Sequence, residues 1–204
     1  IVPKLKTHIV NGSGVDINKF SFTEVPKTNI SFLLVARLLG EKGLREYAAA
    51  AKIVKDQFSN VEFDIVGAED ESLDAISIKE VKSWSKYVNY KGSTNDVRPY
   101  IKKCHVYVLP SYHEGLPRSS LEAMSIGRPI ITTNASGCKE TVEEGKNGFM
   151  VPVGSSEELA NKMIWFVKNK DKIQSMGEHS RLIVENRFDV RSVNKEMMKI
   201  LEMK

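Results

Sequence analysis

Short apolar runs alternate with segments of helical periodicity through the first three quarters of this 204-residue chain. The runs are typical of buried β-strands and occupy residues 32–36, 61–66, 88–91, 106–109, 129–133 and 148–151. Strands that alternate with helices predict βαβ units, in which the strands lie parallel. We therefore expect an α/β fold with a doubly wound, mostly parallel six-stranded sheet.

Helices are expected between these strands. The pattern predicts them over 44–58, from the acidic run Glu69–Glu71 to Lys86, from Asp96 as N-cap to Cys104, and over 119–127. Past Gly154 helical periodicity dominates up to Lys204, with breaks near Asn169 and at 186–189. We expect a single domain, in which 1–30 lead in from a preceding domain, 31–154 form the α/β core and 155–204 are a helical extension.

The last predicted helix, 190–204, carries an apolar stripe at helical spacing. The stripe consists of Val193, Met197, Ile200 and Leu201. It either packs within this domain or faces another part of a larger protein.

Composition and charge narrow the possible classes of protein. With 41% hydrophobic and 27% charged residues the chain reads as globular, which excludes disordered and collagen-like classes. No apolar run approaches the roughly 20 residues of a membrane helix. The net charge of +4 is spread along the chain, whereas nucleic-acid binders concentrate such charge in stripes, so we expect no nucleic-acid partner. Cys104 and Cys138 fit no CxxC motif and are compatible with a reducing, cytoplasmic location.

Two loops at the carboxyl ends of the strands carry candidate chemistry. Arg37 and Lys42 follow the first strand, and residues 110–118 follow the fourth strand and lead into a helix. Ligands of such sheets bind outside the carboxyl ends of the strands, and free N–H groups at a helix N-terminus favour phosphate. A diphosphate between these groups would find its charge matched without a metal. The alternative is that both cations are solvated loop residues.

Glu114 lies in the second loop and Glu122 about one turn into the helix that follows. Carboxylates accept hydrogen bonds from sugar hydroxyls, often two at once. One glutamate could therefore hold a ribose and the other a hexose. The alternative is that Glu114 is a surface turn residue and Glu122 faces solvent.

Other catalytic motifs are missing from the sequence. The chain has no Asp-x-Asp, no GxSxG, no Walker A loop and no histidine pair at metal-ligand spacing. The Gly12-Ser13-Gly14 segment lacks the strand, helix and third glycine of a dinucleotide fingerprint. We expect neither a metal nor a cofactor.

A longer series of motifs resembles one family. Glu114 and Glu122 form an E-x7-E pair, which resembles that of the retaining GT-B glycosyltransferases, in particular glycosyltransferase family 4 of the group 1 type. The resemblance covers residues 8–204 and rests on segments in the family's order: Asn11–Asp16, Val35–Leu38 with Glu41–Leu44, Asp64–Gly67, Tyr90–Gly92, Pro110–Met124, Gly127–Ile130, Gly137 with Glu140, and Gly145–Val151. It implies the donor-binding, Rossmann-like half of a GT-B fold.

The resemblance also implies roles for single residues. Arg37 and Lys42 would bind the nucleotide diphosphate, Glu122 the ribose and Glu114 the transferred sugar, which makes Arg37, Lys42 and Glu114 the catalytic set. Amides around Arg118 and Ser119 would bind phosphate, and the edge at 88–92 with Tyr90 would meet the base. The remaining donor-binding candidates are Gly14, Gly67, Gly115 and Leu116.

Two positions depart from the family pattern. Ala68 stands where a second glycine often follows the strand, which affects how closely a ligand approaches. Arg118 replaces a more usual apolar residue, and it either adds a cation near the phosphates or points to solvent.

By this resemblance, the chain is the half of a retaining glycosyltransferase that binds a nucleoside-diphosphate sugar. The full enzyme would transfer a hexose to a polysaccharide or lipid-linked acceptor. It would need an N-terminal acceptor domain, so the isolated chain would be inactive, and it would touch the inner face of the membrane peripherally. Two alternatives stay open: a nucleotide-sugar epimerase on the same fold, and a nucleotide-binding subunit that needs a partner chain.

Overall fold

The computed structural model describes residue 10 and residues 12–202. The start of the predicted lead-in segment, residues 1–9 and Asn11, lies outside the described residues, as do residues 203–204. The strands are β1 (Ser31–Val35), β2 (Glu62–Val66), β3 (Asn89–Tyr90), β4 (Val106–Leu109), β5 (Ile130–Thr133) and β6 (Gly148–Val151). The α-helices are α1 (Leu44–Gln57), α2 (Ile78–Ser83), α3 (Arg98–Lys103), α4 (Arg118–Ile126), α5 (Ser156–Lys168), α6 (Ile173–Arg187) and α7 (Val190–Glu202). Short 3-10 turns span Gly40–Lys42, Lys139–Thr141 and Lys170–Lys172.

The six strands form one sheet in the order β3-β2-β1-β4-β5-β6, and every neighbouring pair is parallel. This confirms the predicted six-stranded sheet. The strand order runs in opposite directions on the two sides of β1, which pairs with both β2 and β4. Such a reversal opens a crevice at the carboxyl ends of the two central strands.

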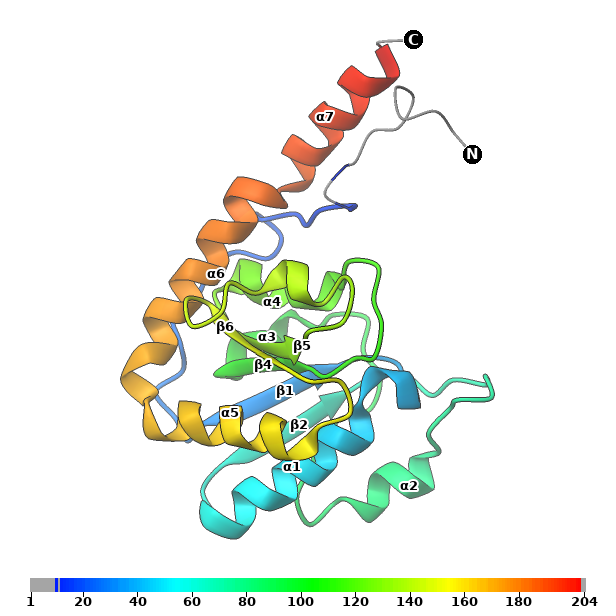
Figure 1. The fold of residues 1–204 in the computed structure, drawn as a ribbon, viewed down its shortest axis with the longest axis vertical. Coiled ribbons are helices and arrows are strands. Elements are labelled where there is room, and N and C mark those ends of the chain that lie inside the picture. Colours follow the sequence, from blue (N-terminus) through cyan, green and yellow to red (C-terminus); the bar gives the residue numbers. More distant parts are fainter. Residues whose placement is uncertain (1–9, 11, 203–204) are drawn as a thin grey trace.

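Helices cover both faces of the sheet, because successive side chains of its buried strands point to opposite sides. Phe32 and Leu34 of β1 belong to the apolar cluster that includes α1 and α5. Leu33 belongs to the second cluster, which includes α3, α4 and α6. Figure 1 shows α1 and α5 on one side of the sheet and α4 on the other. The fold is therefore doubly wound.

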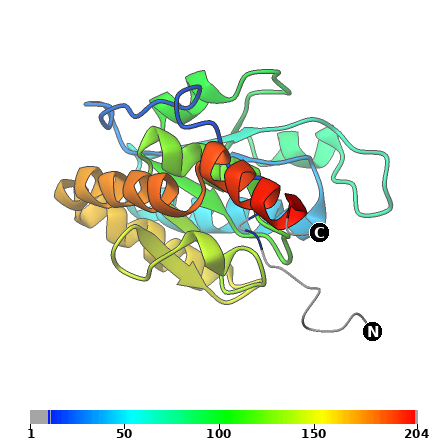
Figure 2. The same ribbon diagram turned by 90° about the horizontal axis from the view of Figure 1, so that it is seen from above.

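The C-terminal helices follow the predicted breaks. The helix α5 ends at Lys168, and α6 and α7 are separated by Phe188 and Asp189. Figures 1 and 2 show α7 continuing beyond α6 and away from the sheet. Of the predicted apolar stripe on α7, Val193 is buried, whereas Met197 and Leu201 are exposed.

The predicted helix start at Glu69–Glu71 is wrong. The helix α2 begins only at Ile78, where the Ser77 hydroxyl accepts a hydrogen bond from the Glu80 amide. The preceding segment is a loop bound to the residues after β1, since the Leu38 amide donates to the Ala68 carbonyl and the Gly40 amide to the Asp74 carbonyl. These tertiary hydrogen bonds override the local preference for a helix.

The predicted start of the next helix is nearly right. Asp96 accepts a hydrogen bond from the Arg98 amide, but α3 begins at Arg98 and Val97 occupies the N-cap. A two-residue interval between acceptor and amide is that of an Asx-turn rather than an N-cap. The charged hydrogen bonds from Arg98 lower the pKa of Asp96 to about 2.

A fully buried arginine fastens the segment before β1 to the domain. Arg128 follows α4, and its guanidinium donates to main-chain carbonyl oxygens of Thr23, Glu24, Ile101 and Lys102. It also donates to the Thr23 hydroxyl at 2.8 Å. A buried guanidinium is stable only when its N–H groups have partners, so this segment and α3 are held by one residue.

Candidate functional site

Several of the site residues predicted from the sequence lie in the two loops at the carboxyl ends of β1 and β4. The loop after β4 packs on the loop after β1: the Tyr112 amide and the Ser111 hydroxyl both donate to the Glu41 carbonyl, at 2.8 and 3.1 Å. Gly43 lies so close to Pro110 that a Cβ on it would collide with the Pro110 carbonyl. The two loops therefore form one rigid unit at the crevice.

Lys42 and Glu114 meet directly in this unit. Lys42 Nζ donates to Glu114 Oε1 at 2.9 Å, and both side chains are more than four-fifths buried. A second carboxylate, Glu41, lies 3.3 Å from the same ammonium. Burial by itself lowers the pKa of Lys42, but the hydrogen bond and charge of Glu114 raise it more, so the net shift is upward. The ammonium is therefore firmly charged.

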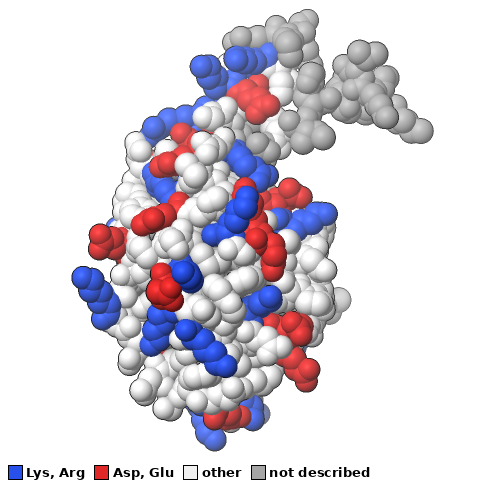
Figure 3. Space-filling model, turned by 60° about the vertical axis from the view of Figure 1, so that its left-hand side comes forward, with Lys and Arg blue, Asp and Glu red and all other residues white. Residues whose placement is uncertain are grey.

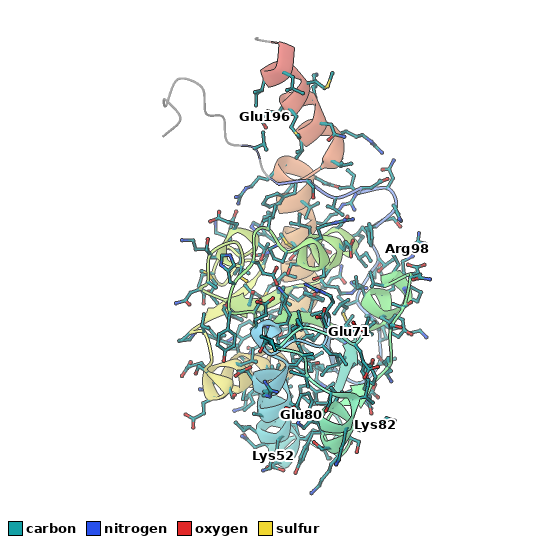
Figure 4. The ribbon with its side chains drawn as sticks, turned by 90° about the vertical axis from the view of Figure 1, so that its right-hand side faces the viewer. Lys52, Glu71, Glu80, Lys82, Arg98 and Glu196 are labelled. Carbon is teal, nitrogen blue, oxygen red and sulfur yellow. The ribbon has the colours of Figure 1, made fainter. Side chains whose placement is uncertain are left out.

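Arg37 reaches the same edge but pairs elsewhere. Its Nη1 donates to Asp70 Oδ2 at 2.6 Å, and the guanidinium side of the pair is 63% exposed. Hydrogen bonds from Ser72, followed by those from Arg37, hold the pKa of Asp70 below its ordinary value. Figure 4 views the molecule from the side that carries this acidic loop, marked by Glu71. Arg37 is thus a cation at the mouth of the crevice, with one carboxylate partner.

Glu122 of α4 lines a cavity of about 370 Å³ together with residues 13–16 and 19–20. Its side chain is only 15% exposed, and Arg118, at 4.0 Å, is its one ion-pair partner among the described residues. Burial raises the pKa of Glu122. Gly14 and Lys19 line the same cavity, so two of the predicted donor-binding residues, Gly14 and Glu122, lie at one cavity. A desolvated carboxylate of this kind favours a ligand that donates hydrogen bonds.

The N-terminus of α4 is open toward the crevice. Pro117 occupies the N-cap and no side chain caps the helix, which leaves the first-turn amides around Arg118 and Ser119 available. The Arg118 side chain is 76% exposed, which agrees with the reading that it points to solvent. Space around Gly115 is open, whereas Leu116 packs against Gly12.

Tyr90 and Gly67 contact each other on the β2–β3 side. The Tyr90 hydroxyl donates to the Gly67 carbonyl at 2.8 Å. A Cβ on Gly67 would collide with the Ala36 carbonyl, so the close approach of β1 and β2 requires glycine there. Gly67 thereby has a packing role that stands beside its predicted contact with a ligand.

The supporting residues around Glu114 were missed in the sequence. A Cβ on Gly137, which follows β5, would collide with the Glu114 and Gly115 carbonyl oxygens, and the Glu114 amide donates to the Ser136 carbonyl. Thr133 and Ser111 join the same loops, since the Thr133 hydroxyl donates to the Ser111 carbonyl at 2.5 Å. The sequence signal that could have revealed these supporting residues is the presence of polar residues at the end of a buried strand.

The described residues contain no group of three or more His, Cys, Asp or Glu side chains that could hold a metal ion. None of the helices in the part of the chain that the structure describes is long and apolar enough to cross a membrane. On the face drawn in Figure 3, Lys and Arg are interspersed with Asp and Glu.

The fold is shared with solved glycosyltransferases of the GT-B type. HepE of Anabaena, solved in complex with UDP, superposes with a TM-score of 0.83 at 25% identity, over 94% of this chain and 56% of HepE. TarM superposes with a TM-score of 0.77 at 20% identity, over 88% of this chain and 37% of TarM, which supports the fold alone.

The model of the family "Glycosyl transferases group 1" matches residues 16–183, and the chain belongs to this family. A Campylobacter jejuni relative, N,N'-diacetylbacillosaminyl-diphospho-undecaprenol alpha-1,3-N-acetylgalactosaminyltransferase, is 28% identical over 78% of this chain and 44% of its own length. The putative colanic acid biosynthesis glycosyltransferase WcaL of Escherichia coli is 28% identical over 95% of this chain and 50% of its own length. The chain spans about half the length of these curated relatives.

Proposed function

We propose that this chain is the donor-binding half of a retaining glycosyltransferase, which takes a hexose from a nucleoside-diphosphate sugar. The observation that carries the proposal is the meeting of Lys42 with Glu114 at the crevice between β1 and β4. A group that neutralises phosphate and a group that accepts hydrogen bonds from sugar hydroxyls lie there within 3 Å of each other. Neighbouring positions for these two groups suit a ligand in which a diphosphate is joined directly to a sugar.

In this proposal the protein lowers the barrier by stabilising the leaving group. Negative charge builds up on the diphosphate as the bond to the sugar breaks. Lys42, Arg37 and the open N-terminus of α4 would stabilise that charge, and fixed charges in a partly dry site are usually the largest contribution to catalysis. The five other phosphate and sugar candidates lie on the loop after β4 and in the first turn of α4: Glu114, Gly115, Leu116, Arg118 and Ser119.

The nucleoside would lie at the end of the diphosphate opposite to the transferred sugar. Glu122, with Gly14 beside it, would accept hydrogen bonds from ribose hydroxyls, because its carboxylate is desolvated and lines an open cavity. Tyr90 and Gly67 would border the base. No metal is needed in this arrangement, since the charge of a diphosphate is matched by side chains and amides.

The relatives support both parts of the proposal. HepE is described in complex with UDP, and the C. jejuni relative is named for transfer to an undecaprenol-linked sugar. We infer that the full enzyme modifies a polysaccharide or lipid-linked acceptor, held by an N-terminal domain, with peripheral contact at the membrane. Because the chain spans about half of its relatives, we expect it to bind a nucleoside diphosphate by itself and to transfer no sugar.

Calorimetry with UDP, GDP and ADP tests the donor site. One of the three nucleotides should bind. Lys42→Ala or Arg37→Ala should weaken its binding about tenfold, because each change removes one charge-assisted hydrogen bond. Lys52→Ala is the matched control, since Lys52 is an exposed cation on α1 that pairs only with Asp56 among the described residues. Unchanged affinity in both site variants would overturn the assignment.

Product analysis tests the reaction. We expect no sugar transfer by this chain. When the chain is joined to an acceptor-binding half, the product should keep the anomeric configuration that the sugar has in the donor. Conversion of the donor sugar into an epimer without any acceptor would instead show a nucleotide-sugar epimerase.

A further inference from the structure

A second cavity lies next to the proposed donor site and has no part in it. Its volume is about 500 Å³, and it is lined by Gly40, Glu41, Arg45, Glu46, Asp74 and Tyr112. It sits between the first turn of α1, the loop after β2 and the loop after β4. Its lining residues include neither Glu114 nor Glu122.

Tyr112 provides an aromatic surface that is fixed in place. The ring is 44% exposed, although its hydroxyl donates to Glu46 Oε1 at 2.8 Å and its amide donates to the Glu41 carbonyl at 2.8 Å. An aromatic ring held at both its main chain and its hydroxyl cannot turn inward. Its exposed apolar surface is available to the C–H face of a flat, amphipathic ligand.

Polar side chains are held in place around the ring. Asp74 Oδ2 accepts a hydrogen bond from the Glu41 amide at 2.6 Å. Arg45 forms two hydrogen bonds with Glu80 of α2, at 2.6 and 3.0 Å, and Glu80 is labelled in Figure 4. A ligand therefore meets carboxylate acceptors and guanidinium donors whose positions are already set.

Gly40 makes the room between these groups. A Cβ at this position would lie 2.5 Å from Asp74 Oδ1 and 2.9 Å from Arg45 Nη1. The backbone of Gly40 is not left-handed, so the absence of a side chain is a matter of space and not of conformation. A methyl group on Gly40 would therefore change the shape of the cavity.

The charge of the cavity selects against phosphate. Three carboxylates, on Glu41, Glu46 and Asp74, line it with the single guanidinium of Arg45. An uncharged ligand with many hydroxyl groups can donate to the carboxylates and lie flat on Tyr112. Glu41 also lies 3.3 Å from Lys42 Nζ, and Lys42 contacts Glu114, so the cavity is one side chain away from the proposed sugar position.

We propose that this cavity is a saccharide-binding subsite that takes an uncharged sugar residue. Its assignment to a residue of the acceptor glycan rests on the proposed function. The donor half would then hold part of the acceptor itself, on the α1 side of the crevice.

The test is a titration of the isotope-labelled chain with the methyl glycosides of glucose, galactose, N-acetylglucosamine and N-acetylgalactosamine, followed by amide chemical shifts. At least one glycoside should shift the amides of Gly40, Glu41 and Tyr112. Tyr112→Ala and Gly40→Ala should each weaken that binding about tenfold, because each change removes or displaces one group of contacts with the sugar. Gly40→Ala moves only the ends of two flexible side chains, so the fold should persist. Leu73→Ala is the control, since Leu73 is fully exposed at a nearby loop tip.

Parallel titrations with UDP, GDP and ADP separate the two proposals. If a nucleotide binds and no glycoside shifts these amides, the subsite is disproved while the donor site stands. Shifts that persist unchanged in both Tyr112→Ala and Gly40→Ala disprove it too, as does tighter binding of glucose 1-phosphate than of methyl glucoside at this position. Glycoside binding that both variants weaken, in a chain that binds no nucleotide, supports the subsite and overturns the donor site.

Discussion

Lys42 and Glu114 are separated by 72 residues along the chain, yet the ammonium and the carboxylate lie 2.9 Å apart. Each comes from a loop at the carboxyl end of a central strand, β1 for Lys42 and β4 for Glu114. Without a ligand, each neutralises the other in a largely buried position. A diphosphate would therefore have to compete with Glu114 for the ammonium.

This competition predicts the effect of Glu114→Gln. The amide cannot neutralise Lys42, so a bare nucleoside diphosphate should bind about fivefold more tightly, within the range of one charge-assisted hydrogen bond. Sugar transfer by an enzyme that includes this half should fall, since a carboxylate acceptor is lost. Calorimetry with the nucleotide that binds the parent chain measures the first effect. Glu157→Gln, an exposed change on α5, is the control, and equal or weaker binding by Glu114→Gln would contradict the idea.

Glu122→Gln should stabilise the ligand-free domain and weaken nucleotide binding. The raised pKa of Glu122 means that the folded state favours the protonated form. Stability from this group is complete below the ordinary value of 4.5 and is lost as the pH rises through the folded value. The gain from Gln should thus be about 1 kcal/mol at neutral pH and vanish in acid. Denaturant unfolding at pH 7 and pH 4 measures it, and a gain that is equal at both pH values would refute this reading.

A pair of glycine variants tests the support of the Glu114 loop. Gly137 and Gly145 both have a left-handed backbone, with φ values of +77° and +73°. A Cβ on Gly137 would collide with the Glu114 and Gly115 carbonyl oxygens, whereas nothing lies within 4 Å of a Cβ on Gly145. Gly145→Ala should therefore destabilise by only about 1 kcal/mol, the strain of the backbone.

Gly137→Ala should destabilise by about 2 kcal/mol more than Gly145→Ala, because the main chain of the Glu114 loop has to move. It should also weaken nucleotide binding, which Gly145→Ala should leave intact. Thermal unfolding and calorimetry on the two proteins decide the matter. Equal losses of stability would show that Gly137 is required only for its conformation.

Arg128→Ala should be among the most damaging single changes. Removal of the guanidinium leaves carbonyl oxygens of α3 and of the segment before β1 buried without donors, and such losses cost about 3–5 kcal/mol. Arg98, whose side chain is partly exposed and pairs with Asp96 two residues away, provides the matched control. Unfolding in urea should show a large shift for Arg128→Ala and a small one for Arg98→Ala. Comparable shifts would argue against the buried network.

The strands and most helices could be predicted from the sequence because the apolar pattern of a parallel sheet is strong and local. The acidic loop after β2 could not. Glu69–Glu71 look like the first turn of a helix, yet Asp70 and the neighbouring main chain bind the loop that contains Arg37. The contacts that replace the helix are made with a loop about 30 residues away along the chain, so the local sequence does not show them. Arg128 is a similar case, since no local pattern shows that an arginine will be fully buried.

For the site, strand order explains what could be predicted. Parallel strands place the loops with Lys42 and Glu114 at one edge, and the sequence was enough to infer that. It could not show that the two side chains would pair with each other, nor that Asp70 would hold Arg37, because long side chains choose partners only in the packed structure. The support that Gly137 gives to the Glu114 loop was not predicted for the same reason, since its constraint is the nearness of the Glu114 main chain.

The place of β1 between β2 and β4 has a consequence for the order of folding. The strand β1 pairs with β2, which follows it closely along the chain, and with β4, which lies some seventy residues further on. Contacts between residues so far apart in the sequence form slowly. The two sides of the crevice therefore come together only once this late pairing is made. Fraying of the outer strand β6 should spare nucleotide binding, whereas separation of β1 from β4 should abolish it in one step.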